Sequence, residues 1–352
     1  MNNENTRRLL TEQAQAYPNM QIRDLLKYLY QSAFGCEHMA PDPQKAAGMI
    51  RAELEEISPD QPPLVEPLDG EYSRVHLSCL GEGLRVETLA GLFCASARQE
   101  PDGMAAMEEK ISVARELIIR GTLPFSVCEF DGEVAEWRAN GCPALRHSEI
   151  FRAQYKPAYR VISKDYVPFL PLLARIDQML QRGRVTLAIE GGSASGKTTL
   201  GELLERIYGC TVFHMDDFFL RPEQRIPARY AEVGGNVDRE RFLEEVLLPL
   251  AEHRPVVYRK FDCATQTLGA PIQVHPQRLT VIEGAYSMHP ELAHHYDLSV
   301  FLDISPALQK KRIEKRNTPP MAKRFFDQWI PLETAYFTQT QARRRCDLSI
   351  SI

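Results

Sequence analysis

The second half of the chain alternates short apolar runs with longer segments whose apolar residues recur at helical spacing. Runs such as "LTVIEG" and "LSVFLD" show no alternation with polar residues, which is typical of strands covered on both faces. Alternating strands and helices favour a doubly wound parallel sheet. We predict strands at 185–190, 210–214, 256–258, 279–283, 298–303 and 348–352, and helices near 198–208, 238–253, 306–316 and 325–345.

The first half shows no such alternation. The segments "IRDLLKYLYQSAF" and "GMAAMEEKISVARELIIRG" carry apolar residues at helical spacing, and Gly121 follows the second one as a helix C-cap would. We therefore predict a mainly helical α+β domain of unassigned role at residues 1–160, a linker helix at 161–183 and an α/β domain at 184–352.

Composition narrows the class of protein. The 352 residues are 44% hydrophobic, which is enough for two cores, and the net charge of −5 without a long basic run argues against nucleic acid as a partner. No apolar stretch approaches the roughly 20 residues that a bilayer requires, so we expect a cytoplasmic protein without a membrane partner. Eight cysteines without a C-x-x-C pair predict reduced thiols. The sequence leaves open whether the protein forms a homo-oligomer.

A glycine-rich segment, "GGSASGKTT", joins the strand predicted at 185–190 to a helix. Its spacing and its flanking elements fit the P-loop pattern G-x-x-x-x-G-K-[ST]. Glycines let successive backbone N–H groups point inward, and the helix N-terminus adds positive potential, so the segment predicts a site for the phosphates of ATP. In this pattern Lys197 reaches the β- and γ-phosphates and the Thr198 hydroxyl binds Mg²⁺. The predicted nucleotide-binding residues are Gly191, Gly192, Ser193, Ala194, Ser195, Gly196, Lys197, Thr198 and Thr199.

Carboxylates follow two of the other predicted strands. Asp216 and Asp217 end the strand in "VFHMDDFFL", and Glu283 ends the one in "LTVIEG". In a parallel sheet these strand ends lie at one edge, beside the phosphates. A carboxylate there can bind Mg²⁺ or accept the proton of an attacking hydroxyl. Helix capping by the two aspartates and a solvated loop position for Glu283 remain alternatives.

Residues 184–352 resemble the uridine kinase and phosphoribulokinase group of P-loop kinases. The motifs "GGSASGKTT", "DDFF", "NVDRERF", "VVYRKFD", "VIEG" and "YDLSVFLD" occur in the order and near the spacing of that family. The resemblance implies that Asp216 is the catalytic base and that it shares Mg²⁺ with Thr198 and Glu283. It also implies an acceptor pocket lined by Asp238, Tyr258 and Phe261.

The segment "KKRIEKRNTPPMAKR" is rich in lysine and arginine, and its "NTPP" should end the helix before it. A basic segment of this kind can close on the nucleotide as a lid and neutralise charge during phosphoryl transfer. The resemblance favours Arg312 and Arg316 as the catalytic residues of the lid. A solvated helix surface is the alternative for each basic residue.

These features predict an ATP- and Mg²⁺-dependent kinase that phosphorylates a hydroxyl of a small-molecule acceptor, uridine-like or a related metabolite. Uridine kinases usually carry a histidine shortly after the aromatic pair of the acceptor pocket, and this chain has Cys263 or Thr265 there instead. Pantothenate, glycerate or a sugar phosphate are therefore alternative acceptors. An ATP-sensing regulatory or interaction protein is the alternative from another class.

The first domain matches no known motif. "FGCEH" and "RVHLSC" bring histidine and cysteine together, but their spacing fits no zinc pattern, so buried thiols and ordinary polar histidines are the preferred interpretation. The segment "ALRHSEIFRAQYKPAYRVI" is rich in polar and aromatic side chains. It could form a polar ligand pocket, an interface with the kinase-like domain or an amphipathic surface. Its polar residues are His147, Glu149, Arg152, Tyr155, Lys156, Tyr159 and Arg160.

Overall fold

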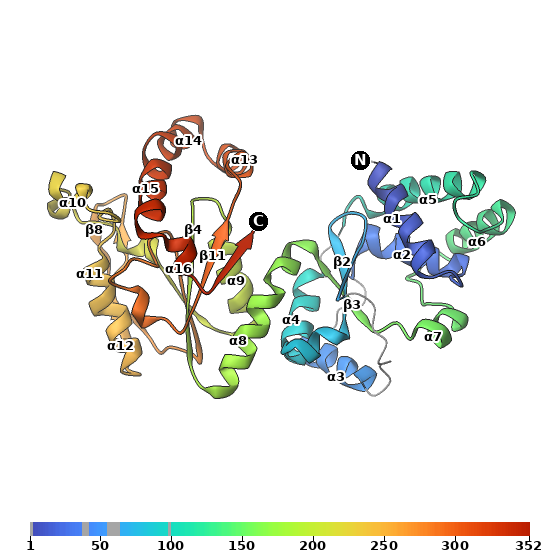
Figure 1. Ribbon diagram of the computed structural model, residues 1–352, viewed down its shortest axis with the longest axis horizontal. Coiled ribbons are helices and arrows are strands. Elements are labelled where there is room, and N and C mark those ends of the chain that lie inside the picture. Colours follow the sequence, from blue (N-terminus) through green and yellow to red (C-terminus); the bar gives the residue numbers. More distant parts are fainter. Residues whose placement is uncertain (1–2, 37–41, 55–63, 98–99) are drawn as a thin grey trace. The chain divides into compact units, whose positions relative to one another are not determined.

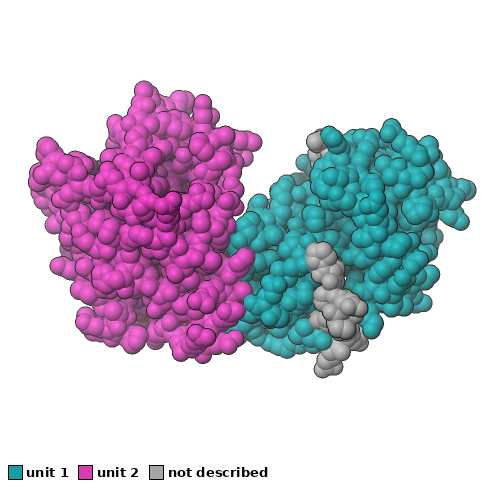
Figure 2. Space-filling model, viewed as in Figure 1, with its two compact units in different colours: residues 1–170 teal, residues 171–352 magenta. Residues whose placement is uncertain are grey.

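The computed structural model describes residues 3–36, 42–54, 64–97 and 100–352. The chain forms two compact units, Met1–Leu170 and Pro171–Ile352 (Figure 2). The first unit continues past residue 160, the end predicted for the first domain, because the strand Tyr159–Ser163 pairs with a strand of that unit. Glu37 and His38 of "FGCEH" lie outside the described residues.

The first unit surrounds a small antiparallel sheet with helices (Figure 1). The sheet has the order β1-β2-β3, with β1 Val65–Pro67, β2 Tyr72–His76 and β3 Tyr159–Ser163. The helix α5 ends as predicted, because Gly121 has a φ of +71° and donates its N–H to Ile118 O. The helices are α1 Asn3–Ala16, α2 Ile22–Phe34, α3 Pro43–Leu54, α4 Val86–Ser96, α5 Gly103–Ile119, α6 Val127–Ala139 and α7 Glu149–Tyr155.

The second unit is a parallel sheet covered on both faces, which confirms the predicted fold class. Its order is β12-β11-β4-β10-β5, and every pair is parallel. The strand β10 lies between β4 and β5, so the chain leaves β4, forms an edge strand and then returns to fill the gap. The strands are β4 Val185–Gly191, β5 Thr211–His214, β10 Leu279–Glu283, β11 Leu298–Asp303 and β12 Leu348–Ser351.

The helices of the second unit follow the predicted segments closely. On one face α9 packs against β4, β5 and β10, and α8 lies beside it (Figure 1). One-turn π segments at Leu243–Leu247 and Phe325–Trp329 join shorter helices into longer ones. The helices are α8 Leu170–Arg182, α9 Lys197–Tyr208, α10 Pro227–Ala231, α11 Arg239–Phe242, α12 Leu248–Ala251, α13 Pro306–Arg316, α14 Pro319–Arg324, α15 Ile330–Thr340 and α16 Ala342–Arg345.

One predicted strand does not belong to the parallel sheet. The strand β6, Val256–Tyr258, pairs antiparallel with β9, Ile272–Val274, so the expectation that it adds to the parallel sheet was wrong. Val257 is exposed between two buried neighbours, and this alternation suits a strand that is covered on one face only. A second small ribbon pairs β7, Phe261–Asp262, with β8, Thr267–Leu268.

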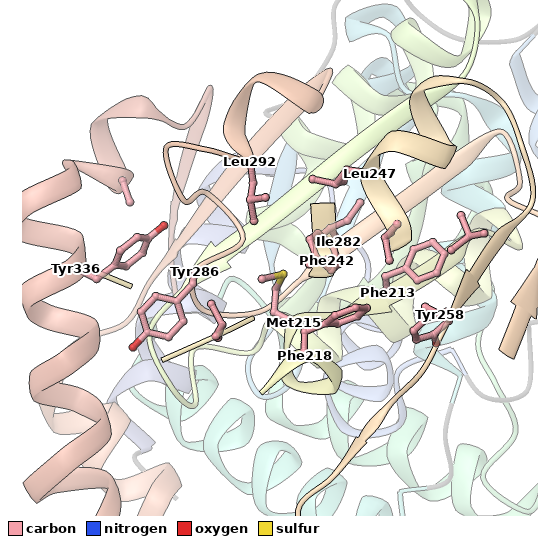
Figure 3. Close-up of a cluster of buried hydrophobic side chains, with 14 of the residues drawn as sticks. Phe213, Met215, Phe218, Phe242, Leu247, Tyr258, Ile282, Tyr286, Leu292 and Tyr336 are labelled. Carbon is pink, nitrogen blue, oxygen red and sulfur yellow. The ribbon is translucent and has the colours of Figure 1, made fainter. Parts of the chain in front are cut away.

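A cluster of buried side chains fills the space between the parallel sheet and the helices on its other face (Figure 3). Phe213 and Ile282 come from strands, Phe242 and Leu247 from the helical segment that begins with α11, and Tyr336 from α15. All five are at most 1% exposed. This packing fixes the carboxyl ends of β5 and β10 relative to α15.

Among the described helices, none combines the length and the apolar character that crossing a membrane requires.

Candidate functional site

The segment between β4 and α9 forms a tight loop at the carboxyl edge of the sheet. Gly191, Ala194 and Gly196 have positive φ values of +151°, +62° and +98°. A Cβ atom on Gly191 would lie 2.6 Å from Leu302 O of the neighbouring strand, so only glycine fits there. The loop ends at Lys197, where α9 begins, so the helix N-terminus faces the loop as the P-loop pattern predicts.

The loop also has donors suited to an anion. Lys197 folds back over it, and its Nζ donates to Gly191 O at 2.9 Å and to Gly192 O at 3.0 Å. Ser195 is wholly buried, and its hydroxyl has no hydrogen-bond partner among the described residues. A movable ammonium, an unpaired hydroxyl and a helix N-terminus in one loop fit the phosphates of a nucleotide.

Glu283 ends β10 and is brought against the start of α9 because β10 lies next to β4. Thr198 Oγ1 donates to Glu283 Oε1 at 3.2 Å, so two of the three residues predicted to bind Mg²⁺ are in contact. His214 Nδ1 lies 2.6 Å from the same oxygen, and this hydrogen bond raises the pKa of His214. Sequence reasoning did not single out His214, because a histidine at a strand end has no motif of its own.

The two neighbouring aspartates have different surroundings. Both lie in the 3₁₀ turn Met215–Phe218 that follows β5. Asp216 is an exposed residue whose carboxylate makes no hydrogen bond to the described residues, whereas the Asp217 carboxylate lies 3.0 Å from Lys260 Nζ. Desolvation by the neighbouring protein raises the pKa of Asp216, Lys197 opposes the shift and Glu283 adds to it. Of the two aspartates, Asp216 is therefore the one whose carboxylate is free to bind a ligand or to accept a proton.

The set Thr198, Asp216 and Glu283 supplies the hard oxygen ligands that Mg²⁺ prefers, and Mg²⁺ usually takes only one or two protein carboxylates. The described residues contain no group of three or more His, Cys, Asp or Glu side chains arranged to bind a metal ion. By the chemistry of their oxygens, Thr198, Asp216 and Glu283 fit a magnesium ion.

The predicted acceptor residues gather around the turn that carries Asp216. Asp238 donates its N–H to Phe218 O at 2.8 Å, and its carboxylate, 1% exposed, caps α11 and pairs with Arg241. Tyr258 stacks on Phe218 with ring centroids 5.7 Å apart. Phe261 belongs to β7, which contacts the same turn. Asp238 and Tyr258 thus also hold the turn in place.

Helices α13 and α15 hold the tip of the loop. Gln309 Nε2 donates to Ser193 O at 2.8 Å, and Arg312 Nη1 donates to Ala194 O at 3.1 Å. The N–H and the hydroxyl of Ser193 both donate to the carboxylate of Glu333, at 2.8 and 2.6 Å. Sequence reasoning missed Gln309 and Glu333, because they lie more than 100 positions from the loop and belong to no short motif.

The two arginines predicted for the lid differ. Arg312 reaches the loop, as described above, and is half-buried. Arg316 is exposed, and its guanidinium lies 5.5 Å from the ring centroid of Phe325. The structure thus brings Arg312, but not Arg316, against the glycine-rich loop.

A buried acid before the loop was also missed. Glu190 is wholly buried, and its carboxylate accepts the backbone N–H groups of Gly191, Tyr286 and Met288 and the Tyr336 hydroxyl, at 2.9 to 3.2 Å. Burial raises the pKa of Glu190 to about 7, while these donors oppose the rise. Glu190 thereby ties the glycine-rich loop to the segment after β10 and to α15.

Replacing Glu190 with glutamine should destabilise the second unit, because one amide oxygen cannot serve four donors that two carboxylate oxygens now serve. We expect a loss of about 1–3 kcal/mol in the free energy of unfolding. Urea unfolding followed by Trp329 fluorescence in a Trp137→Phe background measures it, since the two tryptophans lie in different units. Glu202→Gln, on the exposed face of α9, is the control. Equal stability of both variants would contradict the role of Glu190.

Comparisons with known proteins give structural likeness only. No protein-family model and no curated protein matches the chain. Among solved structures, a possible uridine kinase from Bacillus stearothermophilus is similar at 23% identity and a TM-score of 0.38, over 51% of this chain and 99% of that one.

Two shikimate kinases are also similar to this chain. The one from Bacteroides thetaiotaomicron matches at 15% identity and a TM-score of 0.27, over 47% of this chain and 86% of its own. The one from Aquifex aeolicus matches at 17% identity and a TM-score of 0.25, over 47% of this chain and 85% of its own. At these identities and TM-scores the likeness assigns no family to the chain.

Proposed function

We propose that the second unit is a small-molecule kinase, which transfers the γ-phosphate of ATP to a hydroxyl of a nucleoside-like or related metabolite. The observation that carries the proposal is the position of Asp216. Asp216 is an exposed residue in the turn after β5, which pairs with the strand that ends at Glu283, and it lies near enough to Lys197 for the ammonium to affect its pKa. An ATP sensor needs the glycine-rich loop but no available base beside it.

Each of these side chains has a role in the transfer. The acceptor hydroxyl loses its proton to Asp216, its oxygen forms a new bond to the γ-phosphorus, and the bond from that phosphorus to the bridging oxygen of ADP breaks. Lys197 and Arg312 hold the negative charge of the transferring group. A magnesium ion bound by Thr198, Asp216 and Glu283 would neutralise phosphate charge.

The identity of the acceptor is the finer part of the proposal. Aromatic side chains of Tyr258 and Phe261 and the carboxylate of Asp238 lie around the Asp216 turn, which suits a molecule with a flat ring or several hydroxyls. Arg225 lies over the ring of Phe261 at 5.5 Å, and Lys260 is close by on Asp217. These cations also suit an acceptor with a carboxylate or phosphate, such as pantothenate, glycerate or a sugar phosphate.

A panel of acceptors tests the proposal on the full-length protein. ADP release is measured with ATP and Mg²⁺ in the presence of uridine, cytidine, pantothenate, glycerate, ribulose 5-phosphate or shikimate, with ATP alone as the baseline. We expect at least one acceptor to raise ADP release well above the baseline and EDTA to abolish the rise. ATP binding without ADP release for any acceptor would instead favour the ATP-sensing alternative.

The contacts of the two lid arginines predict unequal effects. Arg312→Ala should lower kcat by about 10²-fold, because a donor beside the glycine-rich loop is lost at the transferring charge. Arg316→Ala, the matched control from the same helix, should change kcat only a few-fold. Steady-state kinetics with the acceptor from the panel measures both, and a larger effect at Arg316 would show that the lid rearranges to bring Arg316 to the phosphates.

A further inference from the structure

The first unit has a polar interior. In β2, alternation places Arg74 and His76 on one face of the small sheet, where Arg74 pairs in register with Glu66 of β1, and His76 with Tyr159 of β3. These side chains meet one face of α2, where polar residues recur at helical spacing and are at most 7% exposed: Asp24, Lys27, Tyr28 and Gln31.

Arg74 lies at the centre and is 1% exposed. Its Nε and Nη2 donate to Gln31 Oε1 at 2.9 and 2.8 Å, and Nη1 donates to Glu66 Oε1 at 2.7 Å. The rings of Tyr28 and Tyr159 lie 5.1 and 4.6 Å from the guanidinium carbon. A guanidinium has five N–H groups. Three of those of Arg74 donate to the side chains named above, so two remain.

The same interior contains an amide group without an acceptor and a lysine without an ion-pair partner among the described residues. Gln31 is 3% exposed, and the side chains of Arg74 and Tyr159 both donate to its Oε1. These contacts fix the orientation of the amide, so its Nε2 is left with no partner among the described residues. One turn earlier on α2, Lys27 Nζ donates to Leu145 O at 2.9 Å. No carboxylate of the described residues lies within ion-pair distance of the Lys27 ammonium. Burial lowers the pKa of Lys27 to about 8. The cluster therefore has more donors than acceptors.

The acids nearby are already occupied. Asp24 lies 2.9 Å from His147 Nδ1 and accepts the N–H and the hydroxyl of Ser148. The other ring nitrogen of His147 lies 2.6 Å from the Tyr159 hydroxyl. This chain of contacts orients Tyr159, and it leaves the ammonium of Lys27 without an ion-pair partner among the described residues.

The cluster reaches the surface through its aromatic rim. Tyr17 and Tyr159 are half-buried, and the Glu66 side chain is 15% exposed. Tyr17 Oη donates to Glu66 at 3.3 Å. Because these rim residues are partly exposed, a small solute can approach the buried donors from this side by displacing side chains rather than the sheet.

Stability alone does not account for such an interior. A buried ion pair adds little net stability over apolar residues of the same size, and a buried amide group without a partner is destabilising. An unpaired buried lysine adds a further cost. Buried polar and charged groups without partners concentrate at binding and catalytic sites, where a ligand supplies the missing partners.

We propose that the first unit contains a binding site for a small metabolite with an oxyanion group, a carboxylate or a phosphate, whose oxygens accept hydrogen bonds from Lys27, Gln31 and Arg74. Tyr17 and Tyr159 form the mouth of this site. The site is independent of the kinase proposal, because all of its residues belong to the other unit.

Hydrogen–deuterium exchange of the full-length protein tests the site, because it reports α2 and the glycine-rich loop in separate peptides. The probes are inorganic phosphate and acetate, each against sodium chloride at the same ionic strength. We expect at least one anion to slow exchange in residues 22–34 and 147–163, by about tenfold at ten times its Kd. The anion that slows exchange more identifies the bound group as a phosphate or a carboxylate. No slowing by either anion would overturn the proposal.

Two buried lysines of the first unit form a matched pair of variants. Lys27→Met should abolish the anion-dependent slowing and raise the melting temperature, because an unpaired buried charge is removed. Lys110 is equally buried but pairs with Asp69, so Lys110→Met should keep the slowing and lower the melting temperature. Full slowing in a folded Lys27→Met variant would exclude Lys27 from the site, and a lower melting temperature there would indicate a structural role only.

Discussion

Asp216→Asn is expected to lower phosphoryl transfer by about 10²–10⁴-fold while ATP binding stays nearly unchanged. Asparagine keeps the size of the side chain but cannot accept the proton of the acceptor hydroxyl. The glycine-rich loop, which we propose binds the nucleotide, is untouched, because Asp216 makes no side-chain hydrogen bond to it. Single-turnover kinetics with the acceptor from the panel measures transfer, and calorimetry measures the Kd of ATP with Mg²⁺.

The neighbouring residue provides the control for this variant. Asp217→Asn changes the same charge one position along the chain, but Asp217 pairs with Lys260. We expect transfer to fall only a few-fold in Asp217→Asn. An equal loss of ATP affinity and transfer in Asp216→Asn would leave Asp216 a metal-binding or structural role without that of the base, and unchanged transfer would exclude it as the base.

Lys197→Ala is expected to leave the protein folded and to lower turnover by about 10²-fold or more. The ammonium of Lys197 rests on two carbonyl oxygens of the loop, Gly191 O and Gly192 O, from which it can move to the phosphates. No other ammonium lies within hydrogen-bond distance of these carbonyls among the described residues, so the charge of the transferring group would lose its partner. Circular dichroism checks the fold, and steady-state kinetics gives kcat and KM.

A second basic residue on the same helix is the control for Lys197. Arg206 is exposed in the last turn of α9, far along the helix from the loop, so Arg206→Ala should keep full turnover. Wild-type turnover in a folded Lys197→Ala variant would contradict the assignment of the loop as the phosphate site. A large loss in Arg206→Ala would show that the loss reflects helix stability rather than phosphate binding.

The strongest sequence prediction concerned local structure. The spacing of the glycines, Lys197 and Thr198 identified the loop, and uniformly apolar runs located the five strands of the parallel sheet, because strands buried on both faces cannot alternate in polarity. Val256–Tyr258 was assigned to the same sheet in error, since three residues are too few to show the alternation that marks a strand covered on one face.

The partners of these residues were not available from the sequence. Glu333 and Gln309 bind the loop from helices that are far away in sequence, and neither has a spacing rule that links it to "GGSASGKTT". His214 was missed although it lies two residues before Asp216, because its contact with Glu283 depends on the strand order β4-β10-β5. In the first unit, "ALRHSEIFRAQYKPAYRVI" was recognised as polar and aromatic, but three interpretations were left open.

By itself, the sequence determined the fold class and the position of the glycine-rich loop, and it proposed the candidate carboxylates, because each depends on residue types at short fixed spacing. Only the tertiary structure decided which of the two adjacent aspartates is available, which lid arginine reaches the loop, and that His147 and Tyr159 join Arg74 in a buried cluster. These outcomes depend on contacts between segments far apart in the chain. Such contacts are fixed by strand order and packing, which no local pattern of residues encodes.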